Sequence, residues 1–225
     1  MMRLYSFFYI YIASTTLGIG VSLAAWLIPR HYAAWYWPVQ MITLFLGCGV
    51  VLELLRHVLG AYQGARKFAN RIAIFSFCAA LLLAIGFAPF ARSISGSMVE
   101  FERNLRLVQA GLLVSILLLI SYYRIPMGKN LRGMIFGYGI YIGASLVTLA
   151  EAAYSAPRFR RFWVIIQPGS LLLALVIWLV TLWSFQPSPV PDPAIPVETD
   201  YEHLTSRTRS ALRTTRSYLE RSFRL

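Results

Sequence analysis

Two carboxylates stand within or at the end of long apolar stretches, Glu53 and Glu151. A charged side chain in the middle of a membrane helix costs about 3 kcal/mol on insertion scales, so such residues usually have a function or a partner. His57 follows Glu53 by four residues, which places both side chains on one face of a helix. Glu53, His57 and Glu151 therefore form our candidate intramembrane polar site.

Two interpretations of Glu53 are open. With His57 it could be the centre of an intramembrane enzyme, or a polar step in the path of a transported solute. Alternatively, Glu53 lies about two turns from the end of its helix, where His57, Arg56 or interfacial water could satisfy it. Glu151 is expected near the opposite membrane surface with arginines as counter-charges, so we do not expect a carboxylate dyad.

The sequence contains no familiar catalytic or metal-binding motif. CxxC, HExxH, Walker and GxSxG patterns are missing in their required contexts, and the two cysteines and three histidines have no ligand spacing. We therefore expect no metal and no cofactor, and we favour a non-enzymatic protein over an enzyme.

The elements that must position these residues are long apolar segments. Hydrophobic residues make up 58% of the chain and charged residues 13%, whereas an ordinary soluble domain has about 25% charged residues. This composition predicts an all-α fold, a polytopic transmembrane helical bundle of about six spans within residues 1–185. The expected spans are 5–28, 35–59, 68–90, 104–123, 131–154 and 162–185.

Two of the expected spans carry distinctive backbone features. Four glycines in the fifth span form two pairs with a spacing of four, which opens flat notches where another helix can approach closely. These helix-packing glycines are Gly133, Gly137, Gly139 and Gly143. In the sixth span, Pro168 and Gly169 predict a kink, because proline removes an amide donor and clashes with the preceding turn.

The composition changes after residue 185. Residues 186–197 are rich in proline and predict an extended linker. Residues 198–225 predict a basic amphipathic helix that lies on an anionic membrane or binds a partner, with a mostly disordered tail as the alternative. The cations expected to contact lipid head groups or a partner are Arg124, Lys129, Arg132, Arg207, Arg209, Arg213 and Arg216.

The net charge of +12 bears on partners and location. Nucleic acid is not an expected partner, because no separate soluble domain could present a basic groove. The cationic tail favours an orientation with both termini in the cytoplasm. Short loops and a high apolar content are typical of a small bacterial inner-membrane protein, so we expect a multi-pass protein of the cell membrane.

Three classes of function are open. The first, which we favour, is a non-enzymatic sensor, scaffold or assembly subunit that presents its basic tail to a cytoplasmic protein partner. The second is a small transporter or channel that uses Glu53 and the kinked sixth span, and that could act as a homo-oligomer. The third is an intramembrane enzyme centred on Glu53 and His57.

Overall fold

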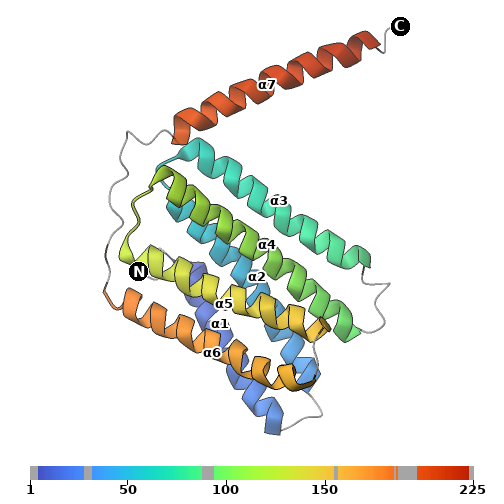
Figure 1. Cartoon of the computed structure of the whole chain (residues 1–225), viewed down its shortest axis with the longest axis vertical. Helices are drawn as coiled ribbons and strands as arrows, with labels where there is room; N and C mark the ends of the chain where they lie inside the picture. Colours follow the sequence, from blue (N-terminus) through green and yellow to red (C-terminus); the bar gives the residue numbers. More distant parts are fainter. Residues whose placement is uncertain are drawn as a thin grey trace.

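The computed structural model describes residues 5–27, 32–87, 94–154, 157–184, 186 and 197–222, although several side chains at helix ends, including those of Glu151 and Arg216, lie outside this description. These residues form seven α-helices and no strand (Figure 1), which confirms the all-α class for the described part of the chain. The helices are α1 (Ser6–Leu27), α2 (Tyr32–Val58), α3 (Gln63–Phe87), α4 (Ile94–Tyr123), α5 (Lys129–Tyr154), α6 (Pro157–Leu182) and α7 (Val197–Ser222).

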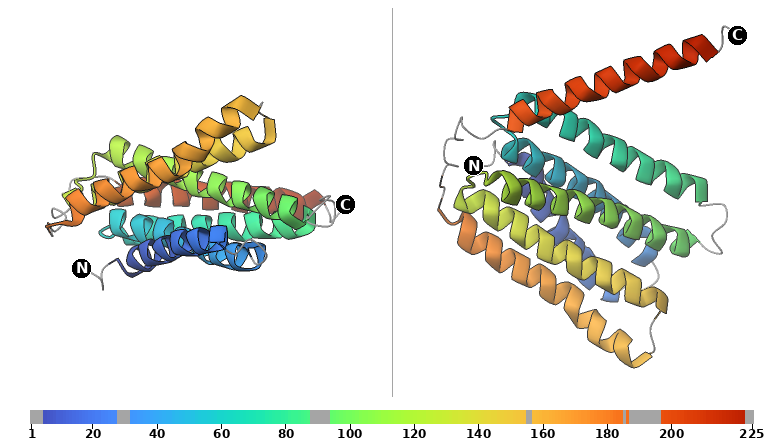
Figure 2. Two further views of the ribbon diagram at one scale, coloured as in Figure 1. Left: turned by 90° about the horizontal axis from the view of Figure 1, so that it is seen from below. Right: turned by 45° about the horizontal axis from the view of Figure 1, so that its top comes forward.

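The first six helices form a bundle in which each helix runs back along its predecessor. Helices α3 to α6 lie side by side, and α1 and α2 form a second layer behind them (Figures 1 and 2). The start of α5 and the end of α6 meet through Asn130, whose side-chain nitrogen donates to the carbonyl oxygens of Thr181 at 3.1 Å and Ser184 at 3.0 Å. These bonds satisfy carbonyl groups that the end of a helix leaves without intrahelical donors.

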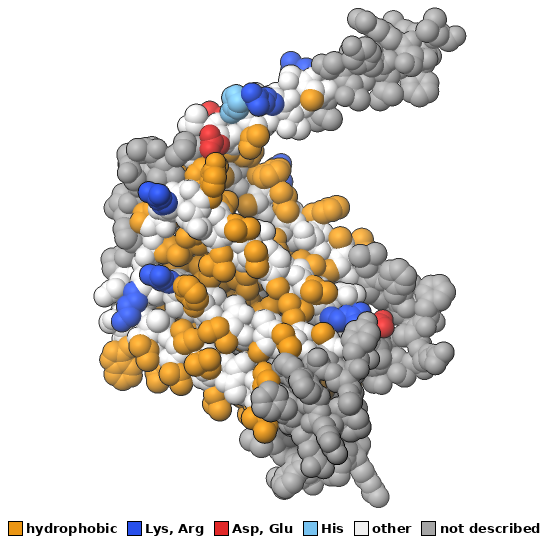
Figure 3. Space-filling view, in the orientation of Figure 1, with side chains coloured by type: hydrophobic (Ala, Val, Ile, Leu, Met, Phe, Trp, Pro, Cys, Tyr) orange, Lys and Arg blue, Asp and Glu red, His pale blue; other side chains and the backbone are white. Residues whose placement is uncertain are grey.

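Within the described residues, four helices are long and apolar enough to cross a membrane, over Tyr36–Val58, Val99–Tyr123, Lys129–Ala150 and Ile165–Leu182. The described apolar stretch of α1, Ser6–Val21, is shorter. Large apolar side chains spread over the described part of the face that Figure 3 shows. Phe75, Leu118 and Leu172 are among the exposed apolar residues of the bundle. A contiguous apolar exterior is uncommon in soluble monomers and is expected of helices that face lipid.

Helix α5 packs closely on α6 at two of its glycines. A Cβ atom on Gly133 would overlap the side chain of Thr181, and one on Gly137 would overlap the indole of Trp178. By contrast, a Cβ atom on Gly139 or Gly143 would meet nothing within 4 Å. The close helix contact therefore depends on the first pair of glycines, while the second pair faces open space.

The core is most tightly closed at the end of the bundle that holds the N terminus. There the ring of Phe8 lies 4.9 Å from that of Trp178 in an edge contact, and Tyr11 lies 5.4 Å from Tyr138. Toward the opposite end, α5 and α6 rise away from α1 and α2 (Figure 2, left). The two helix pairs thus form a wedge that is closed by aromatic side chains at one end.

Helix α7 starts against the bundle and then projects away from it (Figure 1). Its first turns are held by Tyr201, whose ring lies 5.9 Å from that of Phe68 on α3, and by a 3.1 Å hydrogen bond from the Tyr123 hydroxyl to Asp200. Beyond these contacts the side chains of Arg207, Arg209 and Arg213 are exposed.

Candidate functional site

Glu53 lies at the N terminus of α1. Its carboxylate accepts hydrogen bonds from the backbone N–H groups of Phe7 at 3.3 Å and Phe8 at 2.9 Å. The first N–H groups of a helix have no intrahelical acceptor, and the positive end of the helix dipole favours a negative charge there. Although its side chain is buried, Glu53 is therefore satisfied by a helix end.

His57 does not pair with the carboxylate of Glu53. Its Nδ1 atom lies 2.8 Å from the backbone oxygen of Glu53, and its ring lies 4.5 Å from that of Tyr5. Both residues thus fix the start of α1 against the end of α2. This geometry accounts for Glu53 and His57 without a reaction, whereas the side chain of Glu151 lies outside the described residues.

A second buried carboxylate stands on α4. Glu102 and Arg106 are one helical turn apart and form an ion pair, with 2.7 Å between Oε1 of Glu102 and an Nη2 nitrogen of Arg106. The Nε–H group of Arg106 donates to the same oxygen at 2.9 Å. The exposed fractions are only 7% for Glu102 and 3% for Arg106.

Two neighbouring helices complete this ion pair. Gln40 on α2 donates from Nε2 to Oε1 of Glu102 at 2.7 Å. The guanidinium of Arg106 lies over the ring of Tyr141 on α5, with its carbon 5.3 Å from the ring centroid, within the range of a cation–π contact. The ion pair of α4 thus contacts α2 through Gln40 and α5 through Tyr141.

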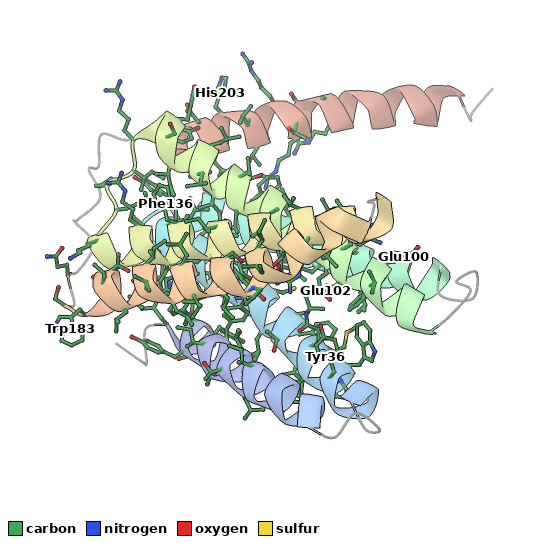
Figure 4. All side chains as sticks on the ribbon, turned by 60° about the horizontal axis from the view of Figure 1, so that its bottom comes forward. Tyr36, Glu100, Glu102, Phe136, Trp183 and His203 are labelled. Atoms are coloured by element: carbon green, nitrogen blue, oxygen red, sulfur yellow. The ribbon has the colours of Figure 1, made fainter. Side chains whose placement is uncertain are left out.

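Glu102 of this ion pair lines a cavity of about 630 Å³ within the wedge. Glu102 from α4 and Tyr36 from α2 both line it, and both lie on the α1–α2 side of the α5–α6 pair (Figure 4). The wall combines apolar side chains with a row of polar ones contributed by α1, α2, α4, α5 and α6. The polar lining residues are Thr15, Tyr36, Gln40, Thr43, Glu102, Tyr141, Ser145, Thr148 and Gln167.

Most of the hydroxyl protons in this wall are already used. The hydroxyl of Thr15 donates to the carbonyl oxygen of Tyr11 at 2.8 Å, and that of Ser145 donates to the carbonyl oxygen of Tyr141 at 2.8 Å. Ser145 in turn accepts a bond of 2.8 Å from the amide of Gln167. What the hydroxyl groups can still offer a ligand is therefore mainly acceptor capacity.

The carboxylate of Glu102 also offers a ligand a hydrogen-bond acceptor. Its Oε1 atom receives the bonds from Arg106 and Gln40, whereas Oε2 has no hydrogen-bond partner among the described residues. A carboxylate oxygen is a strong acceptor, and a charge-assisted hydrogen bond is roughly twice as strong as a neutral one. Glu102 is thus the strongest acceptor that lines the cavity.

Pro168 of the predicted kink is part of the same wall. It lies inside α6, which continues from Pro157 to Leu182, and it borders the cavity one residue after Gln167. A Cβ atom on the following Gly169 would meet nothing within 4 Å. These two residues therefore stand where α6 faces away from its tight contact with α5.

The predicted cations whose side chains are described lie on exposed surfaces. Arg124, Lys129 and Arg132 surround the turn from α4 to α5, and Arg132 lies over the ring of Phe136 at 5.8 Å. On α7, the side chains of Arg207, Arg209 and Arg213 are exposed.

The sequence interpretation did not identify Glu102 and Arg106 as a site. It placed Glu102 in the connection between the expected spans 68–90 and 104–123, but α4 begins at Ile94 and contains both Glu102 and Arg106. The i, i+4 spacing of an acid and a base was the available signal. Gln40 and Gln167 carried no such signal, because only the packing of separate helices brings them to the cavity.

No protein-family model, curated protein or solved structure matched the chain in comparisons with known proteins. The functional conclusions below therefore depend on the geometry of this chain.

Proposed function

We propose that the chain is a six-span protein of a bacterial cell membrane, with both termini cytoplasmic, that binds and carries a small polar solute in the wedge cavity. The observation that supports this most directly is a cavity of about 630 Å³ whose wall includes Glu102, the buried carboxylate that pairs with Arg106. Cavities of about 300–1,000 Å³ suit small molecules, and ionisable groups within membrane bundles commonly mark solute pathways.

The lining favours a solute that donates hydrogen bonds. The charge of Glu102 is already balanced by Arg106, while Oε2 of Glu102 and the hydroxyl oxygens of Thr15 and Ser145 offer acceptors. A polyol or a small protonated amine would supply matching donors. An anion would meet the carboxylate of Glu102 with no unpaired cation among the described lining residues.

The wedge shape supports a carrier. The aromatic contacts of Phe8 with Trp178 and of Tyr11 with Tyr138 close the end near the N terminus. The cavity residues lie toward the opposite end, which is the outer end in the proposed orientation. Alternating access requires that such a closure open while the other end closes, as when one helix pair rocks against another.

A ligand screen tests this function. The purified protein in mild detergent is heated with polyols, small amines and, as a comparison, small carboxylates. We expect a donor-rich solute to raise the melting temperature of the wild type and of Glu100→Gln, an exposed neighbour that does not line the cavity. The increase should be lost in Glu102→Gln and reduced in Thr15→Val, each compared with its own ligand-free state.

Uptake of the stabilising solute into liposomes then separates carriage from binding. We expect uptake by the wild type and by Glu100→Gln that is abolished in Glu102→Gln. The proposal fails if no donor-rich solute stabilises the wild type, or if Glu102→Gln responds and transports like the wild type.

A second candidate is the scaffold or sensor with a basic tail. The observation in its favour is that α7 projects from the bundle with exposed arginines (Figure 1). Purification from membranes in mild detergent, with the full chain and with a chain that lacks residues 197–225, tests it. A single stoichiometric protein that is retained only by the full chain would favour this candidate over the carrier.

A further inference from the structure

An apolar groove of about 350 Å³ lies where α7 meets the bundle. Its walls come from the end of α2, the first half of α3, the second half of α4 and the start of α7. On α3 it is lined by Ala65, Phe68, Ala69 and Ile72, and on α7 by Val197, Tyr201 and Leu204. Phe68, Ile72 and Leu204 each remain about half exposed or more, so the groove is open to its surroundings.

The length of the groove matches one acyl chain. Its α4 lining extends from Leu112 to Tyr123, which corresponds to about 17 Å at 1.5 Å per residue. One leaflet contributes about half of a hydrocarbon core that is about 30 Å thick. A lipid tail that enters beside Tyr123 would therefore be covered over most of its depth.

The surface of α7 that continues from this groove is cationic. Tyr201 lines both the groove and a shallow hollow along α7, whose further lining includes one acidic residue, Glu202, with Thr205, Arg209 and Arg213. Residues spaced by four lie on one face of a helix, so these two arginines follow Tyr201 in a row. Arg207, two residues from Arg209, lines neither hollow and serves as an internal reference.

We propose that the groove between α3, α4 and α7 binds one anionic phospholipid, with an acyl chain along Ile72 and Leu204 and its phosphate on Arg209 and Arg213. Charge complementarity selects the anionic head group, and the apolar walls select the tail. The proposal rests on the membrane location in the proposed function, and it is independent of the solute cavity, which shares no lining residue with the groove. Binding would hold α7 at the cytoplasmic surface.

Native mass spectrometry of the full chain in detergent tests the site with dioleoylphosphatidylglycerol and dioleoylphosphatidylcholine as probes. We expect one phosphatidylglycerol per chain, bound at least tenfold more tightly than phosphatidylcholine. Arg209→Gln and Arg213→Gln should each weaken it about fivefold, since a cation near an anionic surface contributes about this factor, while Arg207→Gln should leave it unchanged.

Two further measurements distinguish the contribution of the acyl chain to binding from that of the phosphate. Ile72→Trp, which fills the groove without a change of charge, should weaken phosphatidylglycerol binding, and glycerol phosphate, which lacks a tail, should neither bind nor compete. The elution profile and the melting temperature in phosphatidylcholine show which variants are folded. Glu102→Gln should still bind phosphatidylglycerol even if it no longer carries the solute, which separates this proposal from the proposed function. Equal binding of both lipids, equal losses in Arg207→Gln and Arg209→Gln, or full competition by glycerol phosphate would overturn the proposal.

Discussion

The two buried carboxylates of the described chain are stabilised in different ways. Glu53 accepts two backbone N–H groups from α1, while Glu102 pairs with a guanidinium on its own helix. Buried charges are tolerated only when hydrogen bonds or counter-charges replace their hydration. Loss of one member should therefore cost more at the Glu102–Arg106 pair, because the remaining residue would keep its charge in a buried place.

The first prediction concerns this pair. Arg106→Ala should lower the free energy of unfolding by about 3 kcal/mol, because it leaves the carboxylate of Glu102 buried without its counter-charge. The double variant Glu102→Leu/Arg106→Met should recover most of this loss, since an apolar pair of similar volume often replaces a buried ion pair without cost. Thermal melts in detergent measure both, with Arg103→Ala as the less buried control. A double variant less stable than Arg106→Ala would contradict the account.

The second prediction concerns the cap of α1. Glu53→Ala should destabilise the protein by about 1–2 kcal/mol, as loss of a helix cap does. Glu53→Gln should cost less, because an amide oxygen can still accept from the N–H group of Phe8. Melting temperatures in detergent measure the loss of stability, and faster amide hydrogen exchange at Phe7 and Phe8 would locate it at the start of α1. If both variants melt at the temperature of the wild type, Glu53 does not have this structural role.

At the scale of the elements, the apolar segments of the sequence predict helices well, because a long run of apolar residues leaves a membrane helix few alternatives. Their boundaries were harder to predict. The polar residues between Ser95 and Arg103 suggested a connection, yet they extend α4 by several turns, and this extension places Glu102 and Gln40 together. Contacts between helices, such as Gln167 with Ser145, depend on packing that no local pattern specifies.

The third prediction separates the two glycine pairs of α5. Gly133→Ala and Gly137→Ala should each destabilise the bundle by about 1–3 kcal/mol, because an added methyl overlaps Thr181 or Trp178 on α6. Gly139→Ala and Gly143→Ala are matched controls with open space, and their melting temperatures should be unchanged or higher. Equal effects of all four variants would show that α5 does not meet α6 in this register.

The fourth prediction concerns the end of α4. Arg124 has a left-handed backbone with φ of 50°, and the N–H group of Ile125 donates to the carbonyl oxygen of Ile120 at 3.1 Å. This is the hydrogen bond of a Schellman motif, in which glycine is the favoured residue at the left-handed position. Arg124→Gly should therefore raise stability by up to about 1 kcal/mol. Arg132→Gly, in the helix α5, should lower it by a similar amount, and chemical denaturation in mixed micelles resolves the opposite signs.

At the scale of the whole molecule, the helices form a wedge with an apolar exterior and a cavity with polar side chains in its wall. Two helix pairs are joined by aromatic rings near the N terminus and separate toward the far end (Figure 2). Glu102 of α4 lines the cavity between them. Large apolar side chains are exposed on the outside, while polar side chains of α2, α4, α5 and α6 line the cavity. Such a distribution is expected when lipid surrounds a bundle that holds a hydrated interior.

The central claim, a water-filled cavity inside a lipid-embedded bundle, is tested most directly by the labelling of single cysteines in right-side-out vesicles. Thr148 lines the cavity, while its neighbour Val147 is exposed on the outside of the bundle. In a Cys48→Ala/Cys78→Ser background, which removes both native cysteines, a membrane-impermeant maleimide added outside should modify Thr148→Cys rapidly and Val147→Cys scarcely, because a thiol in lipid does not ionise. Equal rapid labelling of both, or labelling of Val147→Cys alone, would contradict the account.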